Sequence, residues 1–133
     1  MKTFKDKVAV ITGAGSGMGR YLAVLLAQDG SDVCVCDVNE ETLNETVEML
    51  RKYNVSVSTH ILDVSDKDSI EALPQKVIDQ HGKVDMVFNN AGVATGSHFK
   101  DMDEENWDWV MGINFDGVIN STRAFIPHMI DSP

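Results

Sequence analysis

Short apolar runs alternate with segments of helical periodicity along the chain. Residues 8–11 and 33–36 are continuous apolar runs of the kind found in strands that are buried on both faces. Behind each run, apolar residues recur every three or four positions, which predicts an amphipathic helix. Gly30 is expected to end the first helix, and Asn39 to cap the start of the second. The inward positions are expected to be Leu22, Leu25 and Leu26, then Leu43, Val47 and Leu50.

The same alternation continues in the middle of the chain. Apolar and polar residues alternate over residues 55–61, which predicts a half-exposed strand at the edge of a sheet. A helix is expected from a capping box at residues 65–68 to Gly82, and Pro74 is expected to kink or split it. A fourth strand is predicted over residues 84–88. The inward positions of this third helix are expected to be Ile70, Leu73, Val77 and Ile78.

A polar loop over residues 89–101 leads into one long predicted helix that starts near Asp103. The four strands and four helices alternate, which predicts an α/β fold with a parallel sheet and helices on both faces. Right-handed crossovers give a Rossmann-like doubly wound sheet of strand order 3-2-1-4 in a single domain, residues 1–133. The expected apolar stripe of the long helix is Trp107, Val110, Met111, Asn114, Val118, Thr122, Phe125 and Met129, widened by Ile113, Ile119, Ile126 and Ile130.

Composition narrows the classes of function. The 133 residues carry 11 basic and 21 acidic side chains, a net charge of 11 − 21 = −10, so nucleic acids and anionic membranes are poor partners. No apolar run has the length of a membrane span or of a secretory signal. Cys34 and Cys36 would share a strand face, where they cannot easily pair, and a cytoplasmic protein with reduced thiols is expected. The spacing of the four histidines does not suit a metal site.

The segment between the first strand and its helix is rich in glycine: Thr12-Gly-Ala-Gly-Ser-Gly-Met-Gly19. A strand that enters a helix through glycines brings bare backbone N–H groups and the positive helix end together, which favours a phosphate or pyrophosphate. The spacing fits neither G-x-G-x-x-G nor the P-loop pattern. It fits T-G-x-x-x-G-x-G, with Gly13, Gly17 and Gly19 at the glycine positions.

Asp37 ends the second predicted strand, 37 − 19 = 18 residues after the last glycine of the motif. In this topology its carboxylate can reach the two ribose hydroxyls of a bound adenosine, and it would repel a 2′-phosphate. Neither Ser16 nor Val38 supplies a cation to hold such a phosphate. The sequence therefore predicts a preference for NAD(H) over NADP(H).

Together these features resemble the short-chain dehydrogenase/reductase family. Asp63-Val64 is similar to the family's acidic position near the adenine ring. Residues 89–92 (Asn-Asn-Ala-Gly) are similar to a motif that stabilises the sheet and lines the cofactor site. Asn114 is similar to an active-site asparagine whose backbone helps to order a water in a proton relay. The resemblance assigns cofactor binding to Thr12, Gly13, Ser16, Gly17, Met18, Gly19, Asp37, Asp63, Val64, Asn90, Ala91 and Gly92.

The resemblance implies a catalytic serine and a tyrosine paired with a lysine four residues later, and the sequence departs from the family in these residues. Neither Tyr21 nor Tyr53 is followed by Lys four residues later, and Ser121 lies in the predicted long helix, before the place of the family's fifth strand. The resemblance thus implies the N-terminal, NAD(P)-binding part of a domain that is incomplete at its C-terminus and stops before that strand. The long helix resembles a dimer-forming helix, and together with the unpaired fourth strand it predicts self-association.

Three functions remain open at this point. The first is an NAD(H)-dependent oxidoreductase that transfers hydride between nicotinamide and an alcohol or carbonyl substrate. The second is a non-catalytic NAD(H)-binding or interaction module from a truncated gene. The third is an S-adenosylmethionine-dependent methyltransferase, since Gly13, Gly15 and Gly17 also match G-x-G-x-G. This last function is disfavoured because Ile11-Thr12 stands where an acidic residue is usual, and because it does not explain residues 89–92.

Overall fold

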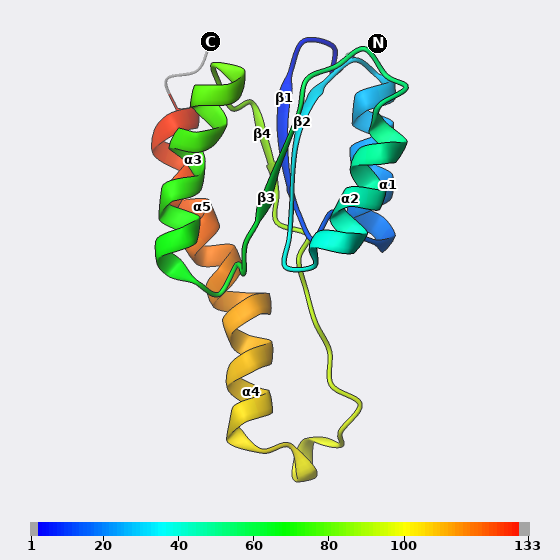
Figure 1. The fold of residues 1–133 in the computed structure, drawn as a ribbon. Coiled ribbons are helices and arrows are strands. Elements are labelled where there is room, and N and C mark those ends of the chain that lie inside the picture. The colour runs from blue at the N-terminus through cyan, green and yellow to red at the C-terminus, as the bar shows by residue number, and fades with distance from the viewer. Residues whose placement is uncertain (1–2, 131–133) are drawn as a thin grey trace.

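The computed structural model describes residues 3–130, which form a four-stranded parallel sheet with helices on both faces (Figure 1). The strand order is β3-β2-β1-β4, as predicted. The half-exposed β3 lies at one edge and β4 at the other. The strands are β1 (Val8–Thr12), β2 (Asp32–Asp37), β3 (Val57–Ile61) and β4 (Met86–Phe88).

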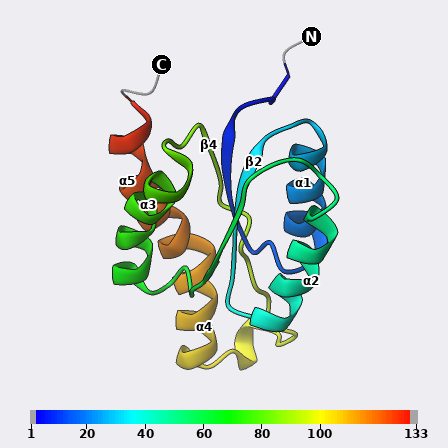
Figure 2. The same cartoon turned by 45° about the horizontal axis from the view of Figure 1, so that its top comes forward.

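The helices divide between the two faces of the sheet (Figure 2). On one face, α1 (Gly17–Gln28) and α2 (Glu40–Leu50) cover alternate residues of the two central strands, with Ala9, Ile11, Val33 and Val35 in the core. On the other face, α3 (Lys67–His81) and α5 (Gly117–Met129) cover the residues of opposite parity. Because both faces are covered, β1 is buried throughout, which explains its continuous apolar run.

The predicted long helix consists of two α-helices that meet at a π-helical turn. A short 3-10 turn, η1 (Phe99–Asp101), precedes α4 (Glu104–Met111), which extends beyond the sheet (Figure 1). The π turn η2 (Gly112–Asp116) then leads into α5. Asp103 caps α4 by accepting the Asn106 N–H at 2.8 Å.

The buried face of this segment differs from the predicted stripe. Ile113, Gly117, Ser121 and Phe125 are buried at a spacing of four, while the predicted positions Ile119, Ile126 and Ile130 are exposed. Small residues occupy the inner face because the backbone approaches the sheet closely: a Cβ on Gly117 would lie 2.8 Å from Val64 Cγ2. Trp107 is also exposed and packs edge-on against Phe99.

Several local predictions are confirmed and others are wrong. Asn39 caps α2, accepting the Thr42 N–H at 3.0 Å. The cap of α3 is Asp66 instead of Ser65, because the Ser65 hydroxyl donates to Asp63. Pro74 does not split α3, which runs from Lys67 to His81.

The structure also differs from the predicted bounds of the outer strands and from one predicted inward position. Leu25 of α1 is exposed, and Ala23 and Ala27 take its expected place in the core. The outer strands are shorter than the predicted ranges of residues 55–61 and 84–88. Residues 131–133, where the fifth strand of the family was expected to begin, lie outside the described residues. Within residues 3–130, no helix combines the length and apolar character that crossing a membrane requires.

Candidate functional site

A cavity of about 350 Å³ opens at the carboxyl edge of the sheet, where the chain leaves the strands. The order of the strands reverses direction here: β2 lies on one side of β1 and β4 on the other. Ligands of open α/β sheets bind at such switch points. The lining residues are Gly13, Ser16, Gly17, Met18, Cys36, Asp37, Val38, Leu62, Asp63, Val64, Asn90, Ala91, Gly92, Val93 and Ile113.

The start of α1 opens into this cavity without a side-chain cap. Ser16 occupies the capping position, but its hydroxyl accepts no hydrogen bond from the helix, and the first turn contains no acidic residue. The helices α2, α3 and α4 each have a side-chain cap instead. The first N–H groups of a helix have no partner within it and carry partial positive charge, so the start of α1 suits an anion.

The glycine loop is held close to the loop after β4. Gly13 has φ +65°, and a Cβ on it would lie 2.8 Å from Ala91 Cα. The Thr12 hydroxyl oxygen accepts the N–H groups of Asn90 and Ala91, both at 3.1 Å. The Asn90 side chain donates in turn to the carbonyls of Thr12 and Gly13, at 3.1 and 3.2 Å. This junction fixes two walls of the cavity relative to each other.

Asp37 presents its carboxylate at the cavity wall with both oxygens oriented by the backbone. Oδ2 accepts the Gly15 N–H at 2.9 Å, and Oδ1 accepts the Asn39 N–H at 3.1 Å. Each carboxylate oxygen can accept further hydrogen bonds, so the carboxylate can still receive two hydroxyl donors. Among the described residues, no lysine or arginine lines the cavity, while Asp63 adds a second acidic group. The electrostatics of this wall disfavour an additional phosphate.

Asn114 lies in the π turn and holds the loop that follows β4. Its Oδ1 accepts the Val93 N–H and its Nδ2 donates to the Val93 carbonyl, both at 2.8 Å. Val93 lines the cavity, and so does Ile113, the neighbour of Asn114. Single π turns inside α-helices occur frequently at functional sites. This one positions the far wall of the cavity.

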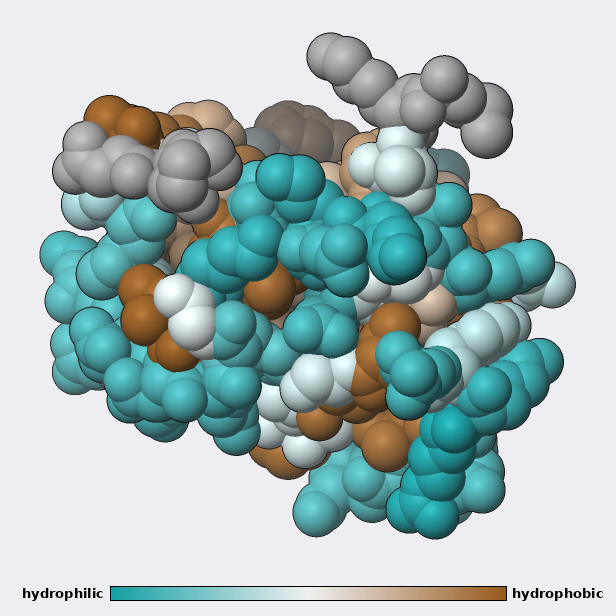
Figure 3. Space-filling model, turned by 90° about the horizontal axis from the view of Figure 1, so that it is seen from above, coloured by the Kyte–Doolittle hydropathy of each residue, from teal (hydrophilic) through white to brown (hydrophobic). Residues whose placement is uncertain are grey.

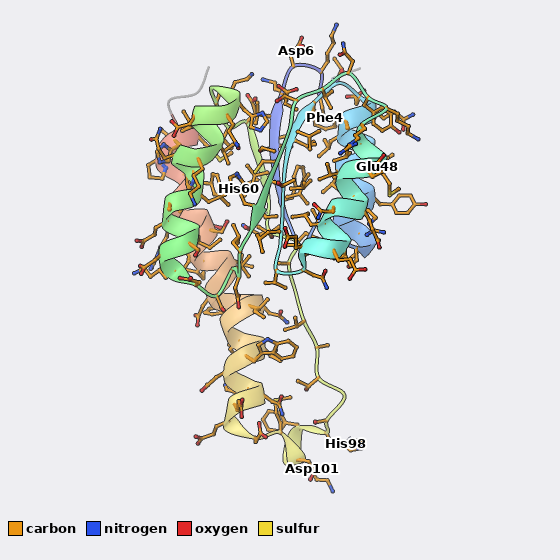
Figure 4. The ribbon with its side chains drawn as sticks, in the orientation of Figure 1. Phe4, Asp6, Glu48, His60, His98 and Asp101 are labelled. Carbon is orange, nitrogen blue, oxygen red and sulfur yellow. The ribbon has the colours of Figure 1, made fainter. Side chains whose placement is uncertain are left out.

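Two buried thiols lie behind the end of β2. Cys34 and Cys36 share the face toward α3, as predicted, and their Sγ atoms are 3.9 Å apart. Hydrogen bonding from Cys36 lowers the pKa of Cys34 to about 5 despite burial, and the same interaction raises the pKa of Cys36. The pKa of His60 is raised, chiefly by its hydrogen bond with Cys34. Figure 4 shows His60 on β3, between the sheet and α3.

The structure gathers most of the predicted site residues around one cavity. The exceptions are Thr12 and Asn114, which hydrogen-bond the loop after β4, and Gly19, which lies close to Gly13 and Asn90. The sequence analysis missed the lining residues Cys36, Val38, Leu62, Val93 and Ile113. These are apolar or thiol residues with no motif of their own, and their only signal is that they adjoin predicted site residues. Within residues 3–130, no group of three or more His, Cys, Asp or Glu is arranged to hold a metal ion.

A doubly wound sheet with a glycine loop after its first strand and an acid at the end of its second has the architecture of the Rossmann class. The family model for short chain dehydrogenases matches residues 7–133. The chain belongs to that family, as the resemblance implied.

Relatives and solved structures agree with this membership. The chain is 37% identical to the 3-oxoacyl-(acyl-carrier-protein) reductase FabG of Thermotoga maritima. The match extends over 126 residues, which are 95% of this chain and 51% of the relative. A Burkholderia phymatum family member in complex with NAD is 41% identical, with a TM-score of 0.92 over 97% of this chain and 46% of that one. Carveol dehydrogenase from Mycobacterium avium in complex with NAD is 29% identical, with a TM-score of 0.90 over 98% of this chain and 52% of that one. The chain thus spans about half the length of each of these three proteins.

Proposed function

We propose that this chain is the NAD(H)-binding part of an oxidoreductase that transfers hydride between nicotinamide and an alcohol or carbonyl substrate. The observation that carries the proposal is the uncapped start of α1, which opens into the cavity next to the Asp37 carboxylate. One feature suits a pyrophosphate and the other a ribose diol. NAD is also the ligand named for both of the similar solved structures described above.

In this proposal, different residues of the cavity bind different parts of the dinucleotide. The backbone N–H groups at Ser16, Gly17 and Met18 bind the pyrophosphate, because they need an acceptor and carry the positive end of the helix dipole. Asp37 accepts hydrogen bonds from the adenosine ribose. When bound, the nicotinamide ring supplies the hydride acceptor or donor. The remaining contacts come from Thr12, Gly13, Gly19, Asp63, Val64, Asn90, Ala91 and Gly92, directly or through the junctions described above.

Asn114 is the one residue of the family's proton relay that we assign in this chain. Its side chain is committed to Val93, so it acts through its backbone, at a π turn where the regular ladder of helical hydrogen bonds is interrupted. A water held there would relay a proton. The serine, tyrosine and lysine that complete the relay in the family are then supplied from outside these residues, and we expect this chain alone to bind the dinucleotide without turnover.

We also propose that the protein self-associates through α4, η2 and α5. Apolar side chains on this segment are exposed, among them Trp109, Phe115, Ile119 and Ile126. An apolar surface of this kind favours association in water. We expect sedimentation analysis of the chain to give an average mass above 14.6 kDa. A monomer at all accessible concentrations would contradict this proposal without affecting the proposed cofactor.

Asp37→Asn tests the cofactor proposal, with Asp32→Asn at the other end of the same strand as its matched control. Asp32 accepts the Ser56 N–H at the opposite edge of the sheet, so its loss should leave binding unchanged. We expect the chain to bind NADH at least about tenfold more tightly than NADPH, and Asp37→Asn to weaken NADH by roughly tenfold, the scale of hydrogen bonds to a charged group.

Fluorescence or calorimetric titration of the 133-residue chain measures these affinities. A chain that binds neither nucleotide, or that binds S-adenosylmethionine instead, would contradict the proposal. Equal affinities for NADH and NADPH, unaffected by Asp37→Asn, would retain the dinucleotide site but remove the assigned role of Asp37.

A further inference from the structure

Gly15 of the glycine loop is enclosed by α2 and by the end of β2, although the T-G-x-x-x-G-x-G pattern leaves its position free. A Cβ on Gly15 would lie 2.6 Å from Thr42 Oγ1 and 2.8 Å from Asp37 Oδ2. Both polar groups of its backbone have partners. Its N–H donates to Asp37, and its carbonyl accepts from the Arg20 guanidinium. The placement of Asp37 relative to the loop therefore depends on what holds Gly15.

The Arg20 guanidinium holds Gly15 in place. Besides the Gly15 carbonyl, Nη2 donates to the Thr42 carbonyl at 3.0 Å and to Glu45 Oε2 at 2.8 Å. Nε donates to Thr46 Oγ1 at 3.0 Å, and that buried hydroxyl donates onward to the Ala14 carbonyl at 2.8 Å. The Arg20 side chain is only 23% exposed. It therefore connects the glycine loop, the first turns of α2 and a carboxylate in one network.

We infer that Arg20 is a positioning residue that fixes Asp37 against the glycine loop and so sets the selectivity for an unphosphorylated adenosine ribose. The network runs from Arg20 to the Gly15 carbonyl and from the Gly15 N–H to Asp37, without a direct contact between Arg20 and the cavity. The inference rests on the proposed function, because it concerns the same dinucleotide site. It adds a residue that no cofactor motif of the sequence includes.

The network has a second consequence for selectivity. A guanidinium near the glycine loop would be a natural partner for a 2′-phosphate, since arginine binds phosphate strongly. In this structure the donors of Arg20 point to two carbonyls, a hydroxyl and Glu45, and Arg20 is absent from the cavity lining. The arrangement keeps the Arg20 guanidinium out of the cavity and uses it to orient the Asp37 carboxylate at the cavity wall.

Arg20→Met tests the inference, because it keeps an apolar stem and removes every donor. Arg51→Met is the matched control: Arg51 is 72% exposed near the end of α2 and pairs with Glu48. Affinities for NADH, ADP-ribose and NADPH are measured by titration, with circular dichroism and thermal unfolding as checks on the fold. ADP-ribose is included because the network acts at the adenosine end, so its affinity should change by the same factor as that of NADH.

We expect Arg20→Met to weaken NADH and ADP-ribose by roughly tenfold or more and NADPH by less, so that the NADH-to-NADPH ratio falls. Arg51→Met should leave all three affinities and the ratio unchanged. Arg20→Lys provides a second readout if Arg20→Met does not fold. The lysine ammonium keeps some of the donors but cannot span all the acceptors of the guanidinium, so the ratio should fall by a smaller factor than in Arg20→Met.

The outcomes separate the inference from the proposed function. Failure of the unmodified chain to bind NADH and ADP-ribose would overturn the proposed function and the inference together. Binding by the unmodified chain, with the same NADH-to-NADPH ratio in the folded Arg20 variants, would overturn the inference alone. A loss of equal size for all three ligands would also overturn it, because a general loosening of the fold would not distinguish a free ribose from a phosphorylated one.

Discussion

The two ends of the strands differ in how their polar groups are paired; the amino edge is where the strands begin, and the carboxyl edge is where they end. At the amino edge, polar groups are paired within the chain: Asp85 accepts the Val8 N–H at 2.8 Å, the Lys83 ammonium at 3.0 Å and the Lys7 ammonium at 3.3 Å. Figure 3 looks onto this end of the molecule and shows a mainly hydrophilic surface with scattered apolar patches. At the carboxyl edge, the start of α1 and the Asp37 carboxylate face a cavity instead.

This difference indicates that the amino edge contributes to stability and the carboxyl edge to binding. Polar groups that are satisfied internally hold the strand starts together and have little left to offer a ligand. Groups with unused donors or acceptors contribute less to folding but are available for binding. The same strands thus have a structural end and a binding end. A substitution at the structural end should change stability alone, whereas one at the binding end should change NADH affinity.

The largest effect is expected from filling the space behind the glycine loop. In Gly19→Ala the new Cβ would overlap the Gly13 carbonyl oxygen and the Asn90 amide, so the junction between the two loops must shift. We expect a loss of about 3 kcal/mol in unfolding free energy, at the upper end for overpacking, together with loss of NADH binding.

Gly82→Ala is the matched control for this substitution, because Gly82 ends α3 and does not line the cavity. Its Cβ would meet nothing within 4 Å, although φ is +81°, so only backbone strain of about 1 kcal/mol is expected, with no change in NADH binding. Urea unfolding and NADH titration measure both variants. A loss of stability at Gly19 no larger than that of the control, with NADH binding retained, would show that the close approach of the loops does not require glycine there.

A smaller effect, confined to stability, is expected at the amino edge. Burial acts to raise the pKa of Asp85, but the Val8 N–H and the ammonium groups of Lys83 and Lys7 outweigh it, so the pKa is lowered. The ionised carboxylate therefore stabilises the fold above its ordinary pKa of about 4, and this contribution is lost as the pH falls through the lowered value. We expect Asp85→Asn to cost about 1 kcal/mol at neutral pH.

The pH dependence sharpens the comparison between the edges. The stability difference between the unmodified chain and Asp85→Asn should be full at pH 7 and should shrink below about pH 4. NADH affinity at pH 7 should not change, because Asp85 lies at the opposite end of the strands from the cavity. Chemical denaturation over this pH range and NADH titration provide the two readouts. Weakened NADH binding by Asp85→Asn would contradict the separation of the two edges.

Much of the fold could be read from local patterns because those patterns report burial directly. The continuous apolar runs identified β1 and β2, and the alternation near β3 indicated an edge strand. The long helix was harder, because nearly every side of it carries apolar residues. Its buried face is set by how closely Gly117 approaches Val64, a contact between segments far apart in the sequence.

The candidate site shows the same division. Motifs identified the groups that present polar atoms, such as Asp37 and the glycine loop, because their chemistry depends on residue type and spacing. The supports of these groups had no such signature. Arg20 carries no motif, and its role follows only from where its partners on α2 lie.

The sequence by itself determined the order of strands and helices, the family and most of the residues around the cavity, because periodicity and spacing encode burial and local backbone geometry. The tertiary structure alone decided which side of α5 is buried, that the helix contains a π turn at Asn114, and that Arg20 serves Gly15 instead of the cavity. Those outcomes depend on distances between segments far apart in the chain, and such distances are fixed only when the helices pack on the sheet.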